Sequence, residues 1–455
     1  MEHTINKELT TGNLNQIFFK YVLSSVLAMM GMSLYIVVDT FFISRSVGTI
    51  GITAGNIVMP MFNMVFGCAR LFEIGAGTFF AFYKAQGDIK KSRTYFTIAS
   101  IALGILSIII MIVGIFFSKE VAYLLGADDS TVTYVTDYLK PIMLFAPSFM
   151  FSSMLYSMVR NDNAPTLAMA AMVACTALNI ILDYVFMFPL KMGMFGASLA
   201  TCLASTAGCL VSAIHMFSKN NNIKLTRIKI DFRELISMCK LGFPTFILEI
   251  CGGIVVFITN KVLRDIGGNI AVATYGILMA FCYLTVSIFQ GIGQGVQPLF
   301  SENTAVGDFA RVKKTIKLTI ISTLMIGGIA TLITQISPSM IIGFFNSENS
   351  ESLSQIAPNA IRIYSIGLIF IGINIVTSNF YTASGKAKQA FVISLLRSLI
   401  FVVPALYILS AVIGLNGVWL AVPTAEILTA VISICLLVNT LKHFNKNNAI
   451  QDLAD

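Results

Sequence analysis

The segment GAGTFFAFYKAQGDIKK at residues 75–91 returns in a second form, GQGVQPLFSENTAVGDFARVKK, at residues 293–314. Each begins with two closely spaced glycines and ends with Gly-Asp and basic residues. A second pair, MGMFGASLA from Met192 and IGLNGVWLA from Ile413, lies 221 residues apart, close to the 218 residues that separate the first pair. Because both pairs share nearly one offset, we predict that the chain duplicates one structural unit over almost its whole length.

Long apolar runs lie between the repeated segments. The 455 residues are 56% hydrophobic and 11% charged, whereas a soluble domain carries roughly a quarter charged residues. A run of ~20 apolar residues crosses a bilayer as a helix, and the alternating pattern of barrel strands is not seen. We therefore predict an all-α membrane protein of about twelve transmembrane helices. The predicted spans are 21–43, 52–82, 95–117, 138–159, 166–188, 196–217, 236–258, 272–299, 315–337, 361–381, 391–412 and 417–440.

Basic residues predict the orientation of these spans. If the amino terminus is cytoplasmic, 21 Lys and Arg fall in cytoplasmic segments and 7 in outer segments. That bias obeys the positive-inside rule and places both termini in the cytoplasm. The polar amino end MEHTINKELTTGNLNQ has no signal-peptide pattern.

An even number of helices in each repeat leaves both repeats facing the same way across the membrane. We therefore predict two six-helix lobes related by a pseudo-two-fold axis along the membrane normal, with a cavity between them. The amino-terminal lobe is expected at residues 1–217 and the carboxyl-terminal lobe at 235–455. Between them, SKNNNIKLTRIKIDFRE at 218–234 is interpreted as a solvated cytoplasmic linker.

Several classes of function are disfavoured by the residues. The basic side chains are scattered over the loops, unlike the single basic face of a nucleic-acid-binding domain. The eight cysteines form no CxxC pair, and the three histidines lie near span ends or in the tails, so a zinc or disulfide framework is not expected. With no HExxH motif or mid-span histidine, we expect neither an enzyme nor a cofactor.

Polar residues inside the apolar spans are the candidates for function, because charge in a bilayer is costly. Asp39 lies in the first span, Asn179 and Asp183 share one helix face in the fifth, and Thr201 lies in the sixth. Together these oxygens suit a monovalent cation, or a proton shared by two close carboxylates. A structural role, as helix caps or at the lipid–water boundary, fits the spacing equally well.

The order of several short motifs resembles a known transporter family. They are VDTFF (38–42), AFYKAQGD (81–88), RNDNAPT (160–166), LNIILD (178–183), MGMFGASLAT (192–201), LGFPTFILE (241–249) and YTASGKAKQA (381–390). Over about residues 15–440 the chain resembles the multidrug and toxic compound extrusion (MATE) transporters, in particular the bacterial branch with DNA-damage-inducible and staphylococcal-type members.

The resemblance implies an antiporter in the bacterial cytoplasmic membrane that exports amphipathic organic cations in exchange for Na⁺ or H⁺. It places the coupling site on Asp39, Asn179, Asp183 and Thr201, and it matches Glu249 to an acidic position of relatives. Lipid, small organic cations and the coupling ion are the expected partners of a monomer. The amide and hydroxyl of the site favour Na⁺ slightly over H⁺.

Further residues are expected to line the substrate cavity or to depart from the family pattern. The lining candidates are Tyr35, Met61, Phe62, Phe151 and Met279, because aromatic faces and flexible thioethers suit organic cations of many shapes. Arg70 and Glu73 are predicted to form a local ion pair. Arg397 is interpreted as a structural residue that snorkels to the membrane surface.

Two rival transporters remain. A lipid-linked-sugar flippase of the same superfamily would have a cationic cavity and often fourteen helices. This chain has twelve predicted spans, which hold more acids than bases once the residues at the span ends are set aside. A major-facilitator transporter has a different basic loop from YKAQGDIKKSR (83–93).

Overall fold

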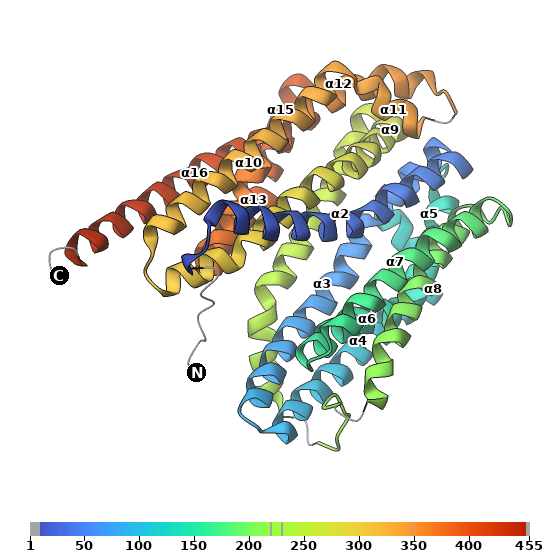
Figure 1. The fold of residues 1–455 in the computed structure, drawn as a ribbon. Helices are drawn as coiled ribbons and strands as arrows, with labels where there is room; N and C mark the ends of the chain where they lie inside the picture. Colours follow the sequence, from blue (N-terminus) through green and yellow to red (C-terminus); the bar gives the residue numbers. More distant parts are fainter. Residues whose placement is uncertain (1–9, 219–220, 229–230, 347, 452–455) are drawn as a thin grey trace. The chain divides into compact units, whose positions relative to one another are not determined.

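The computed structural model describes residues 10–218, 221–228, 231–346 and 348–451, and it shows helices and turns without a strand in these ranges (Figure 1). The helices are α2 (Leu14–Ser46), α3 (Thr49–Ala85), α4 (Ile89–Leu124), α5 (Val132–Leu144), α6 (Ala146–Asn161), α7 (Pro165–Met187), α8 (Gly193–Ala213), η1 (Ile214–Phe217), α9 (Phe232–Ala305), α10 (Phe309–Ile336), α11 (Pro338–Phe345), α12 (Glu351–Ser365), α13 (Leu368–Ala383), α14 (Ala387–Leu395), η2 (Leu396–Ile400), α15 (Val402–Ile413) and α16 (Leu415–Gln451).

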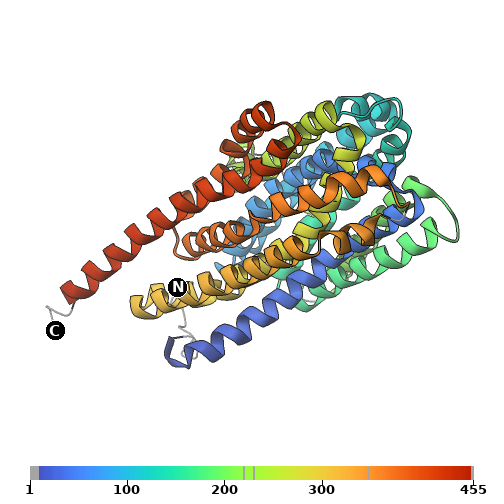
Figure 2. The ribbon, with the colours of Figure 1, turned by 90° about the horizontal axis from the view of Figure 1, so that it is seen from above.

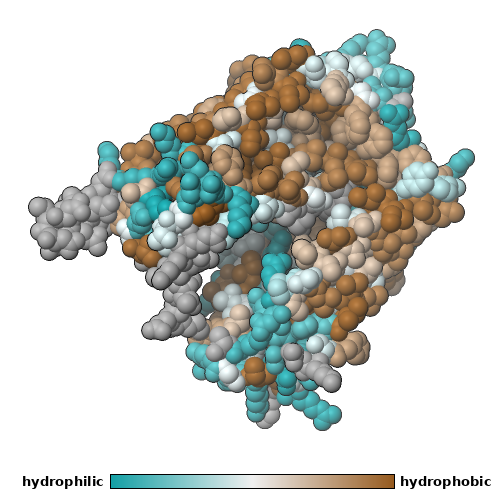
Figure 3. Space-filling model, viewed as in Figure 1, coloured by the Kyte–Doolittle hydropathy of each residue, from teal (hydrophilic) through white to brown (hydrophobic). Residues whose placement is uncertain are grey.

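These helices account for the predicted membrane spans. Within the described ranges, nine helical segments are long and apolar enough to cross a membrane, and two bent pairs, α5–α6 (52°) and α12–α13 (43°), raise the number to eleven. The 74-residue α9 changes direction at Gly268, where φ is +66°. A straight helix of that length would measure ~110 Å against a bilayer core of ~30 Å, so α9 supplies two spans. The predicted all-helical fold of about twelve spans is confirmed, and apolar side chains cover much of the visible helix surface (Figure 3).

The chain packs as two compact units. We call Val38–Lys261 the amino unit, and Met1–Val37 together with Val262–Asp455 the carboxyl unit. Each boundary falls inside a helix, one in α2 and one in α9. The units therefore divide the chain at other places than the predicted lobe boundaries at 217 and 235, which remain predictions.

Close helix contact through glycine holds the amino unit together. A Cβ atom at Gly242 of α9 would collide with the Leu71 carbonyl of α3, and one at Gly75 of α3 would collide with the Met238 carbonyl of α9. Small residues allow helix backbones to approach in this way. The first glycine of the repeated segment at 75–91 thus serves helix packing.

The carboxyl unit uses the same device and adds an aromatic core. The α2 backbone at Val22 lies 2.8 Å from the position of a Cβ atom on Gly295 of α9. Phe18 of α2, Phe300 of α9 and Phe380 of α13 are buried in one cluster beside this contact. Helix α13 also packs against α10, α14 and α16, which are coloured yellow-orange to red in Figure 2.

The repeated segments have the same local geometry. Gly87 and Gly307 both adopt a left-handed conformation, with φ of +81° and +76°. The following aspartates, Asp88 and Asp308, cap α4 and α10, and each accepts a 2.9 Å hydrogen bond from the backbone N–H three residues on. The glycines at the second position of the other repeated pair, Gly193 and Gly414, also match, with φ of +57° and +61°. These matching turns support the predicted duplication.

The linker differs from the solvated loop that the sequence suggested. Within residues 221–228 of the linker, Ile223 is fully buried. The Thr226 N–H donates to Thr97 Oγ1 of α4 at 3.1 Å, and the Asn222 N–H donates to Asp162 at the end of α6 at 2.8 Å. The solvated interpretation is wrong for Ile223 and for the backbone of Asn222 and Thr226, whereas the side chains of Lys224, Leu225 and Arg227 are exposed.

Candidate functional site

A cluster of buried oxygen atoms lies between α7 and α8 in the amino unit. Asn179 and Asp183 lie one turn apart on α7, with exposed fractions of 3% and 0%. Asn179 Nδ2 donates to Thr201 Oγ1 of α8 at 3.2 Å. The Thr201 hydroxyl donates to the Ala197 carbonyl at 3.1 Å, which orients its lone pairs toward α7. The structure thus brings together three of the four residues that the spacing had grouped.

Asp39, the fourth residue, reaches the same region from the part of α2 that belongs to the amino unit. Its charge and that of Asp183 act on each other. The nearest donor to its Oδ2 is the hydroxyl of Tyr138 on α5, at 3.5 Å. Tyr138 is therefore a site residue that the sequence did not indicate, because its place depends on how α5 is rotated.

Most acceptors in this cluster have no donor. Asp39 Oδ1, Asn179 Oδ1 and both carboxylate oxygens of Asp183 are buried without a hydrogen-bond partner in the described part of the chain. A buried unpaired carboxylate is expensive unless a proton or a cation neutralises it. The cluster is therefore suited to bind a small cation or a proton, and Asn179 Oδ1 adds a neutral oxygen ligand.

An acidic cluster with one arginine lies between α3 and α9. Arg70 Nη1 contacts Glu73 Oε1 at 3.2 Å, which confirms the predicted local ion pair. The Ser153 hydroxyl donates to Glu73 at 2.6 Å. Glu249 of α9 packs against Gly67 of α3, and the charges of Arg70 and Glu73 act on it. Glu249 has no basic neighbour on its own helix, but α3 provides one.

Aromatic rings connect the oxygen cluster to this region. The Phe62 ring lies 6.3 Å from the rings of Phe66 and Tyr138 and 6.0 Å from that of Phe149. Tyr138 therefore contacts Phe62 through its ring and Asp39 through its hydroxyl. Such an aromatic surface beside acids suits an organic cation.

The other predicted lining residues are dispersed. Met61 is buried on α3 at 5% exposure, and the partly buried Phe151 of α6 lies near Gly104 of α4. Met279 is partly buried on α9 in the carboxyl unit. The side chain of Tyr35 lies outside the described part of the structure.

The carboxyl unit contains a buried ion pair that we did not predict from the sequence. Arg397 Nη2 and Nε donate to Glu426 Oε1 at 2.8 and 3.0 Å, and Asn374 Nδ2 donates to Oε2 at 2.7 Å. Ser433 in turn donates to Asn374 Oδ1 at 2.9 Å. Arg397 lies in the π-helix η2, a local widening that often marks a functional position. The snorkelling interpretation of Arg397 is wrong, because its guanidinium points to an acid that is 3% exposed.

Fold and site together define a polytopic membrane protein built from two similar halves, with a buried acidic site in one of them. The chain belongs to the MatE family, which matches residues 24–185 and 244–408.

Named relatives cover most of the chain. The multidrug export protein MepA of Staphylococcus saprophyticus is 27% identical over 406 residues, which are 89% of each chain. MepA of Staphylococcus aureus strain bovine RF122 is 29% identical over 410 residues, again 89% of each chain.

Solved structures match the fold. An inward-facing multidrug resistance MATE family transporter aligns with a TM-score of 0.84 at 20% identity, over 91% of this chain and 96% of that chain. The MATE multidrug transporter DinF-BH aligns with a TM-score of 0.75 at 26% identity, over 93% of this chain and 95% of that chain. The family and fold class inferred from the sequence motifs are therefore confirmed.

Proposed function

We propose that this protein is a secondary antiporter that exports amphipathic organic cations in exchange for Na⁺ or H⁺. The observation that carries the proposal is the set of unpaired buried oxygens on Asp39, Asn179 and Asp183. The relatives named multidrug export protein support export as the activity. The aromatic rings around Phe62, beside Glu249 and Asp39, support organic cations as the substrate class.

In the proposed cycle, the ion and the drug favour different conformations. A cation or proton that enters the Asp39–Asp183 site cancels charge that is otherwise buried without compensation. Because α2 carries Asp39, occupation of the site changes the most stable position of that helix and weakens drug binding. Binding energy that differs between two states shifts their populations. Alternating access between lobes at 1–217 and 235–455, joined by 218–234, belongs to this proposal.

We further propose that the protein is a monomer in a bacterial cytoplasmic membrane, with both termini in the cytoplasm. The excess of Lys and Arg in the segments assigned to the cytoplasm supports this orientation. Na⁺ is the favoured coupling ion, since the unpaired Asn179 Oδ1 supplies an oxygen ligand that a proton relay does not need.

The test uses purified protein in liposomes with a fluorescent organic cation. Export is expected only under an imposed Na⁺ or pH gradient, and Asp39→Asn or Asp183→Asn should abolish it. Asp137→Asn is the control, because that aspartate is exposed in the same unit and should leave transport unchanged. Transport without a gradient would refute antiport. If replacing Na⁺ by choline changes nothing while collapse of the pH gradient stops export, the coupling ion is H⁺.

A further inference from the structure

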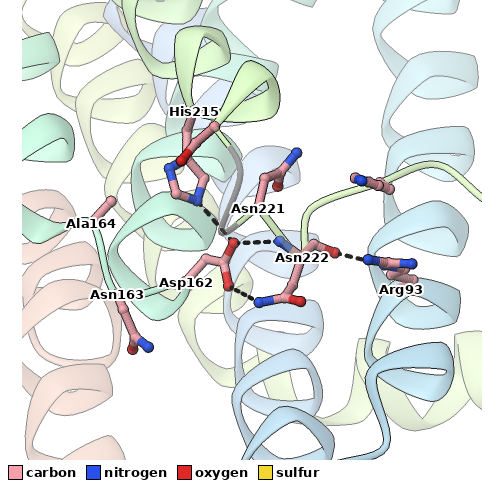
Figure 4. A pocket seen from close by; sticks show the side chains of 9 residues that line it. Arg93, Asp162, Asn163, Ala164, His215, Asn221 and Asn222 are labelled. Atoms are coloured by element: carbon pink, nitrogen blue, oxygen red, sulfur yellow. Dashed lines mark hydrogen bonds and ion pairs between the residues drawn. The ribbon is translucent and has the colours of Figure 1, made fainter.

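A polar pocket of about 590 Å³ lies in the amino unit where three candidate spans end (Figure 4). The start of α4, the residues after α6, η1 and the linker all contribute to it. None of its lining residues belongs to the oxygen cluster or to the Glu249 region. The proposed antiport therefore leaves this pocket without a role.

The acid at the pocket wall is already neutralised from within the protein. Asp162 contacts Lys84 Nζ and His215 Nε2, both at 2.8 Å, and accepts from the N–H and Nδ2 of Asn222 at 2.8 and 3.0 Å. Burial alone would raise the pKa of Asp162, but the hydrogen bonds from Lys84 and Asn222 outweigh it and lower the pKa. The carboxylate is therefore ionised and compensated, and it is not a ligand for an incoming cation.

Two cationic groups of the pocket, in contrast, have unused donors. Arg93 Nε donates to the Asn222 carbonyl at 3.2 Å, and its two Nη groups have no partner in the described part of the chain. Lys224 is exposed and forms no ion pair with the described residues. Arg93 of α4 and Lys224 of the linker both line the pocket. The pocket thus offers uncompensated positive charge to an anion.

The donor set and its position identify the class of anion. An arginine fork beside an ammonium group is typical of phosphate recognition. Basic pockets at the cytoplasmic ends of transmembrane helices bind lipid head groups, and this volume lies in the range of organic ligand sites, ~300–1,000 Å³. We propose that the pocket binds the phosphate group of an anionic phospholipid, with Arg93 and Lys224 as its ligands. The lipid source rests on the cytoplasmic orientation given under the proposed function.

Binding there would fasten the linker to α4 and to the end of α6. Asn222 already joins α4 to the end of α6, since it accepts from Arg93 and donates to Asp162. A phosphate held by Arg93 and Lys224 would add a charge-assisted contact from α4 to the same linker segment. The lipid would thus stabilise the docked conformation of residues 221–226.

The test compares how strongly different lipids bind to and stabilise the delipidated protein in detergent. Thermal unfolding and native mass spectrometry would be measured with dioleoylphosphatidylglycerol, dioleoylphosphatidylcholine or inorganic phosphate. We expect phosphatidylglycerol to bind and to raise the unfolding temperature. Arg93→Gln/Lys224→Gln should weaken that binding by about tenfold or more, as expected for loss of charged hydrogen bonds. The control Lys90→Gln/Arg227→Gln removes the same charge from α4 and the linker outside the pocket.

Equal weakening by both double variants, or equal binding of phosphatidylcholine, would overturn the proposal, since the attraction would then be general surface charge. Inorganic phosphate that protects as well as the lipid would assign the pocket to a soluble anion and overturn the lipid source. If the double variant fails to fold, Lys224→Gln alone is used, because that side chain is exposed. No transport step enters the assay, so its result is independent of the antiport test.

Discussion

Replacing Arg397 by methionine would leave the carboxylate of Glu426 buried without its cation, and we predict that this single change strongly destabilises the carboxyl unit. Glu426 is 3% exposed, and its remaining partner would be Asn374 Nδ2 at 2.7 Å. Methionine keeps much of the apolar stem of arginine, so the change isolates the loss of charge from the loss of packing.

The expected magnitude follows from the geometry. Removing one partner of a buried, hydrogen-bonded ion pair costs ~3–5 kcal/mol, because an uncompensated charge stays behind. The reverse change, Glu426→Gln, should cost less, since the Arg397 side chain is 22% exposed and can regain water. The double variant Arg397→Met/Glu426→Gln removes both charges and should recover most of the loss.

The chain contains its own probe for this measurement. Trp419 is the only tryptophan of the sequence, and it is buried on α16, the helix that carries Glu426. Its fluorescence during denaturant unfolding in detergent would report the free energy of the carboxyl unit for the wild type, both single variants and the double variant. A single Arg397→Met variant as stable as the wild type, or a double variant no better than it, would refute the reasoning.

Three further predictions test other parts of the molecule. Glu249→Gln should weaken the export of cationic drugs while sparing neutral ones in a susceptibility panel, and equal loss for all drugs would contradict a cavity-facing role. The lowered pKa of Asp162 means that its ionised form stabilises the fold fully above pH 3.8, so the stability deficit of Asp162→Asn should be constant near neutral pH and shrink as the pH falls below that value. Thermal unfolding across that range measures it, and a deficit that persists in acid would contradict the charge effect. Gly242→Ala should reduce folded yield, since its Cβ would collide with the Leu71 carbonyl, whereas Gly252→Ala on the same helix meets nothing within 4 Å and should be tolerated; equal yields of the two variants would argue against the close contact.

The sequence could predict features that depend on one helix or one turn. Asn179 and Asp183 share a face because they are four residues apart, and the Gly-Asp turns at 87–88 and 307–308 repeat because each conformation is local. Spans were predictable for a similar reason, since length and hydropathy need no knowledge of neighbours.

Contacts between helices were not predictable in the same way. Arg397 meets Glu426 across 29 residues, and Tyr138 meets Asp39 across 99. Both contacts depend on the rotation of each helix about its axis, which the apolar pattern of a membrane span leaves undetermined. The contacts of linker residues 222–226 with α4 and the end of α6 were not predicted, because a polar composition alone does not show where buried partners such as Asp162 lie.

Under the proposed antiport, the pair of Arg397 and Glu426 also bears on which charges cross the membrane. Both residues lie in the carboxyl unit, whereas Asp39 and Asp183, the carboxylates of the proposed coupling site, lie in the amino unit. A guanidinium that is part of the chain does not dissociate to either side, so the proposed antiport needs no exchanged ion at Glu426. In each cycle, the net charge that crosses the membrane is then carried by the drug and by the ions that bind at Asp39 and Asp183. Because the proposed site has two carboxylates, two monovalent ions are enough to neutralise it, and this sets the largest number of ions exchanged in each cycle.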